Sequence, residues 1–88
     1  MDPSRRVERV QTGVRMEKRL VKVLKALAEY VDLSMGDLLE GIVLHAIDGQ
    51  PSPFSEDTLK TVADLKRIYG LDLDYRDSHL LVEASDGL

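Results

Sequence analysis

The side chains best suited to bind a partner are basic, and they gather at the start of the chain. Residues 1–27 contain eight Lys and Arg against three Asp and Glu, whereas residues 28–88 contain four against thirteen. The overall net charge of −4 therefore conceals one strongly basic end. Such an asymmetry indicates an anionic partner at that end, although a basic helix face in contact only with water would give the same composition.

The sequence lacks the residue types and spacings that catalysis or metal binding would need. The chain contains no cysteine, which removes disulfides, thiolate zinc ligands and thiol nucleophiles together. His45 and His79 do not have the spacing of paired metal ligands. Asp72, Asp74 and Asp77 start like a calcium loop, but the glycine and glutamate that complete such a loop do not follow. With no nucleophile–base pair and no glycine-rich phosphate loop, we expect no enzyme activity, no cofactor and no metal site.

Length and hydropathy set the class of protein. No apolar run approaches the roughly 18 residues of a membrane span, and residues 1–13 lack the apolar stretch of a secretory signal. Together with the lack of cysteine, this favours a cytoplasmic protein that binds no membrane. A chain of 88 residues forms one domain at most. Because so short a chain buries only about 60% of its unfolded surface, it often needs a second copy for stability.

Residues 10–16 (VQTGVRM) have the alternating pattern of a β-strand. One face carries Val10, Thr12, Val14 and Met16, and the other carries Gln11, Gly13 and Arg15. A lone strand leaves its backbone groups unpaired, and the sequence contains no other obvious strand. We therefore expect this strand to pair with the same strand of a second copy. Residues 1–9, which are polar and basic, are expected to form a flexible arm.

A first amphipathic helix is predicted over residues 17–31. It places Leu20, Leu24 and Leu27 on one face and its lysines on the opposite, solvated face. The pattern breaks at residues 32–34. This turn ends in Ser34, which is a good N-cap for a following helix.

A second helix is predicted over residues 35–47. Asp37 in its first turn favours the positive end of the helix. Its apolar stripe consists of Leu38, Leu39, Ile42 and Val43. Leu44 lies on the other side, so this helix has more apolar surface than the first helix can cover, and a second copy is again indicated. Gly36 and Gly41 each lower helix propensity by about 1 kcal/mol, so we expect another group to approach the backbone closely there.

Residues 49–88 form an acidic C-terminal extension. The segment DGQPSPF, residues 48–54, is a linker by composition. A third helix is predicted at about 55–69, capped by Ser55 and ended by Gly70. Its apolar stripe consists of Leu59, Val62, Leu65 and Tyr69. Beyond this helix, apolar and acidic residues alternate briefly over residues 71–75. The run HLLVEA that follows fits one helical turn or two, so no single element is predicted there.

Taken in this order, one short strand, two helices and a capped turn resemble the ribbon–helix–helix (Arc/MetJ-type) DNA-binding proteins. The resemblance is carried by VQTGVRM, by Leu20, Leu24 and Leu27, by the turn Asp32-Leu33-Ser34, and by Leu38, Leu39, Ile42 and Val43. It covers residues 10–47, roughly half of the chain. Two positions depart from the family's pattern. Asp32 stands where Gly is common and must adopt a left-handed conformation, and Glu17 stands where Pro is common.

The resemblance implies a mainly α fold with one short N-terminal strand. The chain is then an intertwined homodimer whose two strands pair as an antiparallel ribbon and enter the major groove of DNA. Residues 10–48 would form the DNA-binding and dimerisation domain, and residues 49–88 a helical extension. The dimer core would contain Val14, Met16, Leu20, Leu24, Leu27, Leu38, Leu39, Ile42 and Val43.

The same resemblance implies which residues contact DNA. Outward-facing strand residues read base edges, which here are Gln11, Gly13 and Arg15. Arginine suits guanine and glutamine suits adenine, whereas a glycine leaves one base unread or lets the ribbon lie deeper. Phosphates are expected to contact Arg9, Lys18 and Arg19, together with Ser34, Met35 and Gly36 at the N-terminus of the second helix.

We therefore expect a sequence-specific DNA-binding homodimer that represses transcription from short, partly palindromic sites. Its partners would be double-stranded DNA and a second copy of itself. Two alternatives stay open. In one, the protein is an antitoxin whose C-terminal extension binds a toxin or another protein through the third helix. In the other, it is a dimeric interaction module that binds no DNA at any salt concentration.

Overall fold

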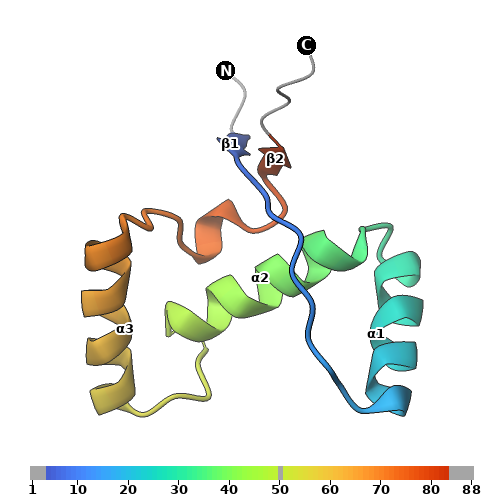
Figure 1. The fold of residues 1–88 in the computed structure, drawn as a ribbon, viewed down its shortest axis with the longest axis horizontal. Coiled ribbons are helices and arrows are strands. Elements are labelled where there is room, and N and C mark those ends of the chain that lie inside the picture. Colours follow the sequence, from blue (N-terminus) through green and yellow to red (C-terminus); the bar gives the residue numbers. More distant parts are fainter. Residues whose placement is uncertain (1–3, 50, 84–88) are drawn as a thin grey trace.

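The helix α2 (Met35–Ile47) lies at the centre of the computed structural model, and the other two helices flank its two ends (Figure 1). The structure describes residues 4–49 and 51–83. In chain order, the elements are β1 (Arg5–Val7), α1 (Lys18–Tyr30), α2, α3 (Glu56–Tyr69), the 3₁₀ turn η1 (Tyr75–Asp77) and β2 (Leu81–Glu83). The predicted mainly helical fold is confirmed for the single chain, and a short N-terminal strand is present, although it lies at Arg5–Val7 and not at residues 10–16.

Local capping signals fix where α1 and α2 begin. The Glu17 carboxylate accepts a hydrogen bond from the Leu20 amide (3.0 Å), and Ser34 Oγ accepts one from the Asp37 amide (3.1 Å). In the turn between the helices Asp32 has a φ of 59°, the left-handed conformation expected from the sequence. The predicted bounds of α2 and its serine cap are confirmed, and those of α1 are confirmed to within one residue at each end.

The third helix also ends where its sequence predicts. Ser55 Oγ accepts a hydrogen bond from the Thr58 amide (3.2 Å). Gly70 has a φ of 69°, which only glycine adopts without strain, and the following Leu71 amide donates to the carbonyl of Lys66 (2.8 Å). Because cap and end signals both lie within a few residues of the helix, sequence alone was sufficient to place it.

The two glycines of α2 have different surroundings. At Gly41 an added Cβ would lie 2.9 Å from Cε1 of His79, so the expected close approach is confirmed, and the group that approaches is the imidazole ring. At Gly36 the nearest atom to such a Cβ would be Ser34 Oγ at 3.9 Å, which is ordinary contact. Close packing therefore explains Gly41, and no packing in the structure explains Gly36.

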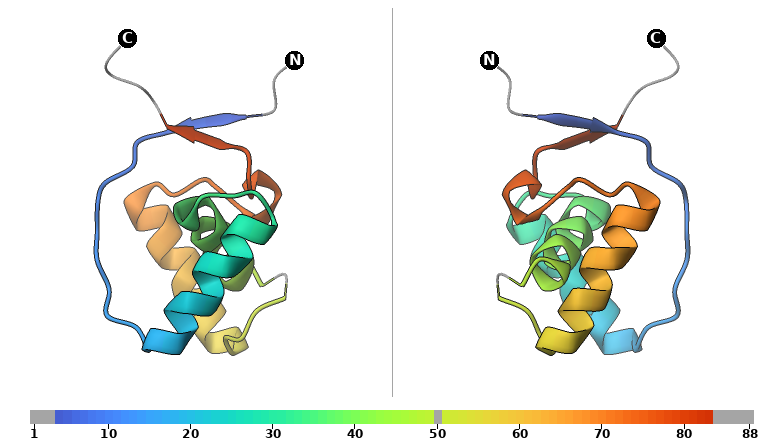
Figure 2. Two further views of the ribbon diagram at one scale, coloured as in Figure 1. Left: turned by 90° about the vertical axis from the view of Figure 1, so that its right-hand side faces the viewer. Right: turned by 90° about the vertical axis from the view of Figure 1, so that its left-hand side faces the viewer.

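The strand pairing within the single chain differs from the sequence prediction. β1 lies in the segment expected to be a flexible arm, and it pairs in parallel with β2 so that Arg5 lies opposite Leu81. Figure 2 shows these strands crossing beyond one end of the helices, with the chain after β1 running down one side to α1. Residues 10–16 belong to that run and have no strand partner in the described part of the chain. Their pairing with a second copy stays a prediction.

The single chain buries few of its apolar side chains. Among the described residues, the buried large or small apolar side chains are those of Ala28, Leu38 and Leu44. The sequence places Leu44 on an uncovered side of α2, but that interpretation was wrong: Leu71 and Leu73 of the C-terminal extension share a small apolar cavity with it. The accessible surface, 7313 Å², nevertheless exceeds the value of about 5,200 Å² that is usual for a compact monomer of 9.9 kDa.

Candidate nucleic-acid interface

The residues expected to read bases lie together on the extended segment between β1 and α1. Gln11, Gly13 and Arg15 are all exposed, and no atom lies within 4 Å of the position that a Cβ on Gly13 would take. The opposite face of the predicted strand is exposed as well, since Val10 and Val14 are 80% and 76% accessible. The segment is therefore free to be contacted on both faces.

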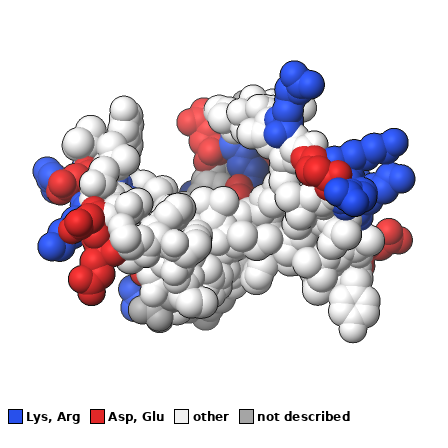
Figure 3. Space-filling view, turned by 90° about the horizontal axis from the view of Figure 1, so that it is seen from below, with Lys and Arg blue, Asp and Glu red and all other residues white. Residues whose placement is uncertain are grey.

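Two exposed cations, Lys18 and Arg19, lie at the start of α1. The Arg19 Nε donates to the Glu17 carboxylate (3.0 Å), which also caps the helix. The hydrogen bond from Arg19, followed by those from the Leu20 and Arg19 amides, lowers the pKa of the Glu17 carboxyl. Figure 3 shows basic side chains gathered at the α1 end of the molecule. Both side chains are exposed, and Arg19 is held by the carboxylate that caps the helix.

The N-terminus of α2 presents free amides beside a basic side chain. Ser34 Oγ caps the Asp37 amide, and the amides of Met35 and Gly36 donate to no acceptor within the described ranges. Lys25 of α1 lines the same shallow depression as Ser34 and Met35, together with the acidic residues Glu29 and Asp32. The sequence assigned Lys25 to a merely solvated face. Its place here could be found only once the turn had brought α1 and α2 together.

Arg9 is placed differently from the other expected phosphate contacts, because its guanidinium lies against α2. Nε and Nη2 donate to the two carboxylate oxygens of Glu40 (2.9 and 2.8 Å), and Nη2 also donates to Asp37 (2.9 Å). Further contacts join it to the Leu81 carbonyl (3.4 Å) and to Glu83 (4.0 Å). The hydrogen bonds to Glu40 raise the pKa of Arg9 above its usual range despite opposing desolvation. Glu40 gave no signal in the sequence, since it lies 31 residues from Arg9.

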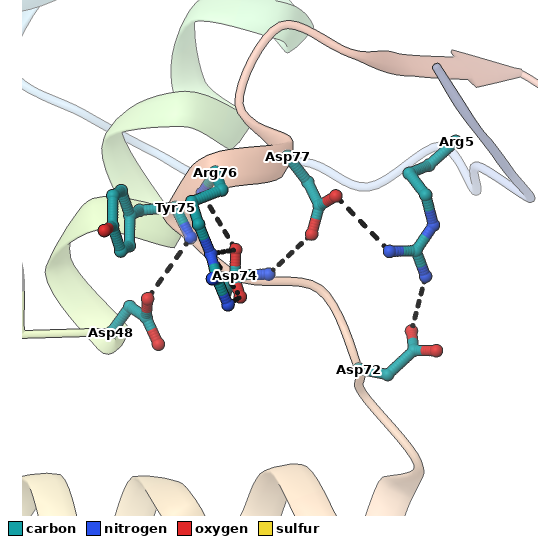
Figure 4. Close-up of polar contacts among 7 residues, drawn as sticks. All are labelled: Arg5, Asp48, Asp72, Asp74, Tyr75, Arg76 and Asp77. Atoms are coloured by element: carbon teal, nitrogen blue, oxygen red, sulfur yellow. Dashed lines mark hydrogen bonds and ion pairs between the residues drawn. The ribbon is translucent and has the colours of Figure 1, made fainter. Parts of the chain in front are cut away.

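The C-terminal extension is held to the same arm by further ion pairs (Figure 4). Arg5 contacts Asp72 (3.2 Å) and Asp77 (3.3 Å). Asp77 also accepts from the Asp74 amide (2.9 Å), and the Tyr75 amide donates to Asp48 at the end of α2 (3.3 Å).

The carboxylates that looked like a calcium loop are thus occupied by protein donors. The pKa of Asp74 is lowered, chiefly by its hydrogen bonds to the Arg76 side chain. In the part of the chain that the structure describes, no three His, Asp or Glu side chains converge as metal ligands do. His45 instead packs its ring 5.6 Å from that of Tyr75.

Comparisons of the chain with known protein families, with curated proteins and with solved structures each found no match. Of the helices in the described ranges, none is long and apolar enough to cross a membrane. The assignment of a function therefore depends on the residues and their geometry.

The lowered pKa of Glu17 predicts a pH-dependent contribution to stability. A carboxyl whose pKa is lowered by folding stabilises the protein above its unfolded pKa, near 4.5, and this contribution is lost as the pH falls through the folded value. Glu17→Gln should therefore lower the melting temperature at pH 7 and have a much smaller effect at pH 3. Thermal melts of both proteins at the two pH values measure this, with Glu29→Gln on the exposed face of α1 as the charge-matched control. An equal difference at both pH values would contradict the cap.

Proposed function

We propose that the protein is a sequence-specific DNA-binding homodimer that represses transcription. The observation that carries the proposal is an uncovered apolar face on α1 and α2. The side chains on it are between 40% and 61% exposed: Leu20, Val23, Leu27, Val31, Ile42 and Val43. In Figure 3 the lower middle of the molecule is free of charged side chains, which lie along its upper edge and toward its two ends. Soluble monomers rarely expose so much contiguous apolar surface, so a second copy is the natural cover.

Dimerisation also supplies a partner for residues 10–16. Their backbone groups face solvent in the single chain, and pairing them antiparallel with the same segment of a second copy gives a two-stranded ribbon. Such a ribbon fits the major groove. It brings two copies each of Gln11 and Arg15 to one surface, where they can pair with adenine and guanine.

The surrounding charge supports the same orientation on DNA. Lys18 and Arg19 at the start of α1, and Lys25 near the N-terminus of α2, are exposed cations that could contact phosphates, although Arg19 would then share its guanidinium with Glu17. The free amides of Met35 and Gly36 provide the anion site expected at a helix N-terminus. Acidic side chains outnumber basic ones by thirteen to four over residues 28–88, so it is the basic N-terminal end of the chain that attracts DNA.

One specific observation favours a second task for the extension. Leu65, Ile68 and Tyr69 of α3 are 47%, 65% and 81% exposed, which leaves an apolar face on this helix after the chain has folded. A helix face of this kind suits a groove on another protein, as in the antitoxin alternative. This alternative keeps the DNA-binding dimer. Both proposals predict that Ile68→Ser and Tyr69→Ser leave DNA affinity unchanged. Only the antitoxin alternative predicts that these substitutions also weaken the binding of a second protein.

If a second copy covers the apolar face, stability must depend on protein concentration. A dimer that unfolds to monomers gains stability by mass action, so the melting temperature should rise steadily as the concentration is raised. Thermal melts across a hundredfold concentration range, with sedimentation equilibrium for the mass, measure this. A concentration-independent melt at monomer mass would remove the basis of the proposal.

The reading role of Arg15 can be tested after the preferred site has been found by selecting bound fragments from random DNA. A palindromic site is expected. Arg15→Ala should preserve the dimer, because the side chain is exposed, yet cost about 1–3 kcal/mol of specific binding in each subunit. Lys60→Ala, on α3 and equally exposed, is the charge-matched control and should change affinity little. Unchanged affinity in Arg15→Ala would exclude the ribbon as the reading surface, and failure to enrich any site would favour the interaction module without DNA binding.

A further inference from the structure

The ion-pair cluster around Arg9 joins the two elements that the proposed function places on DNA. Arg9 immediately precedes the reading segment of residues 10–16, and its partners Asp37 and Glu40 lie in the first two turns of α2. We propose that Arg9 is a positioning residue that fixes the reading segment relative to the phosphate-binding end of α2, and that it is not itself a phosphate contact. This inference rests on the proposed function and adds a residue, Glu40, that the sequence did not reveal.

The geometry of the cluster is that of a rigid connection. Arg9 binds both carboxylate oxygens of Glu40 through Nε and Nη2, the two-point arrangement that fixes the orientation of a guanidinium. Asp37, its other partner, donates its own amide to the Ser34 cap. The side chains of Arg9, Asp37 and Glu40 are only 29–32% exposed, so water screens these pairs less than it screens a surface ion pair. The same turn of α2 therefore carries the anchor of the reading segment and the expected phosphate site.

Arg9 is close enough along the chain to position the residues that are expected to read bases. One residue of extended chain spans at most about 3.6 Å, so the Cα of Gln11 lies within about 7 Å of the Cα of Arg9, whose guanidinium is anchored on α2. A groove lined by Val10, Gln11 and Gly36, among other residues, separates the reading segment from α2 at this point. Without the anchor, nothing else in the described residues ties residues 8–16 to α2 by an ion pair or a hydrogen bond. Loss of the Arg9 ion pairs should thus lower the fraction of molecules in which the reading side chains can contact bases while the N-terminus of α2 contacts a phosphate of the same DNA site.

Charge supports the assignment as well. Asp37 and Glu40 lie next to the amides that are expected to bind a phosphate, and two unneutralised carboxylates there would repel it. Arg9 offsets one of these two negative charges, and the Leu81 carbonyl and Glu83 of the extension complete its surroundings. Nε and Nη2 already donate to carboxylates, and Nη1 lies 4.0 Å from Glu83, so a DNA phosphate would have to compete with three carboxylates for this guanidinium. Arg9 acts through the carboxylates that it holds.

Two variants separate positioning from direct phosphate contact. Arg9→Gln should weaken binding to the selected palindrome at least tenfold while the dependence of affinity on salt stays unchanged. Glu40→Gln should also weaken it, although this substitution removes a negative charge close to DNA. Arg6→Gln is the matched control, because it removes the same charge from the same arm, where Arg6 is exposed on β1. A charge-swapped double variant, Arg9→Glu with Glu40→Arg, should recover part of the affinity that Arg9→Glu alone loses.

A direct contact between Arg9 and a DNA phosphate would give different results for these variants. If Arg9 contacts a phosphate in each subunit, Arg9→Gln should lower the salt slope by about 1.8, and Glu40→Gln should bind DNA as tightly as the wild type or more tightly. That pair of results would overturn the inference. Circular dichroism and the dimer mass identify any variant that does not fold, in which case the milder Glu40→Gln and the double variant decide. If the wild type itself enriches no site, the proposed function fails and this inference with it, whereas enrichment without an effect of Glu40→Gln removes only the inference.

Discussion

A shortage of buried apolar surface is the constraint on which the rest of this structure depends. In the described part of the chain, Leu38 and Leu44 are the large apolar side chains that become buried, and both belong to α2. Of α1 only Ala28 is buried among the described residues, and α3 is joined to the end of α2 by an ion pair between Lys66 and Asp48 (3.6 Å). A core this small contributes little stability. The chain covers one side of α2 with its own C-terminal extension, and we propose that a second copy covers the rest.

Charges that are segregated along the sequence meet in space. The basic arm and the acidic extension lie at opposite ends of the chain, yet Arg5 contacts Asp72 and Asp77, and Arg9 contacts Glu83 as well as the carboxylates of α2. The arm is therefore partly a structural element that holds the extension over α2. The basic residues therefore fall into two groups. Arg5 and Arg9 connect parts of the fold, whereas the exposed cations of α1 can contact an anionic partner. Counting charges along the sequence could not make that distinction.

The helices could be predicted because their signals are local. Ser34, Ser55 and Gly70 each act on neighbours within four residues, and the apolar periodicity of α1, α2 and α3 is visible in one stretch of sequence. The parallel pairing of β1 with β2 joins segments more than 70 residues apart, and each strand has only three residues, which is too few for an alternating pattern. Of the expected site, the exposure of Gln11, Gly13 and Arg15 agrees with the structure, whereas the anchoring of Arg9 by Glu40 could be found only from the fold. Long-range ion pairs leave no periodic trace in a sequence.

We propose that residues 10–16 of two copies pair as an antiparallel ribbon, and the lack of cysteine in the chain allows a direct measurement of this pairing. Single cysteines placed in turn at Thr12, Gly13 and Val14 lie near the middle of that segment. In an antiparallel ribbon related by a twofold axis, at least one of these positions brings its Cα to about 4.4–6.8 Å from its counterpart, the range that a disulfide requires. Mild oxidation should then convert the dimer rapidly into a covalent dimer, with Lys60→Cys on α3 as the control. If none of the three variants cross-links faster than Lys60→Cys, the two segments do not pair and the account is wrong.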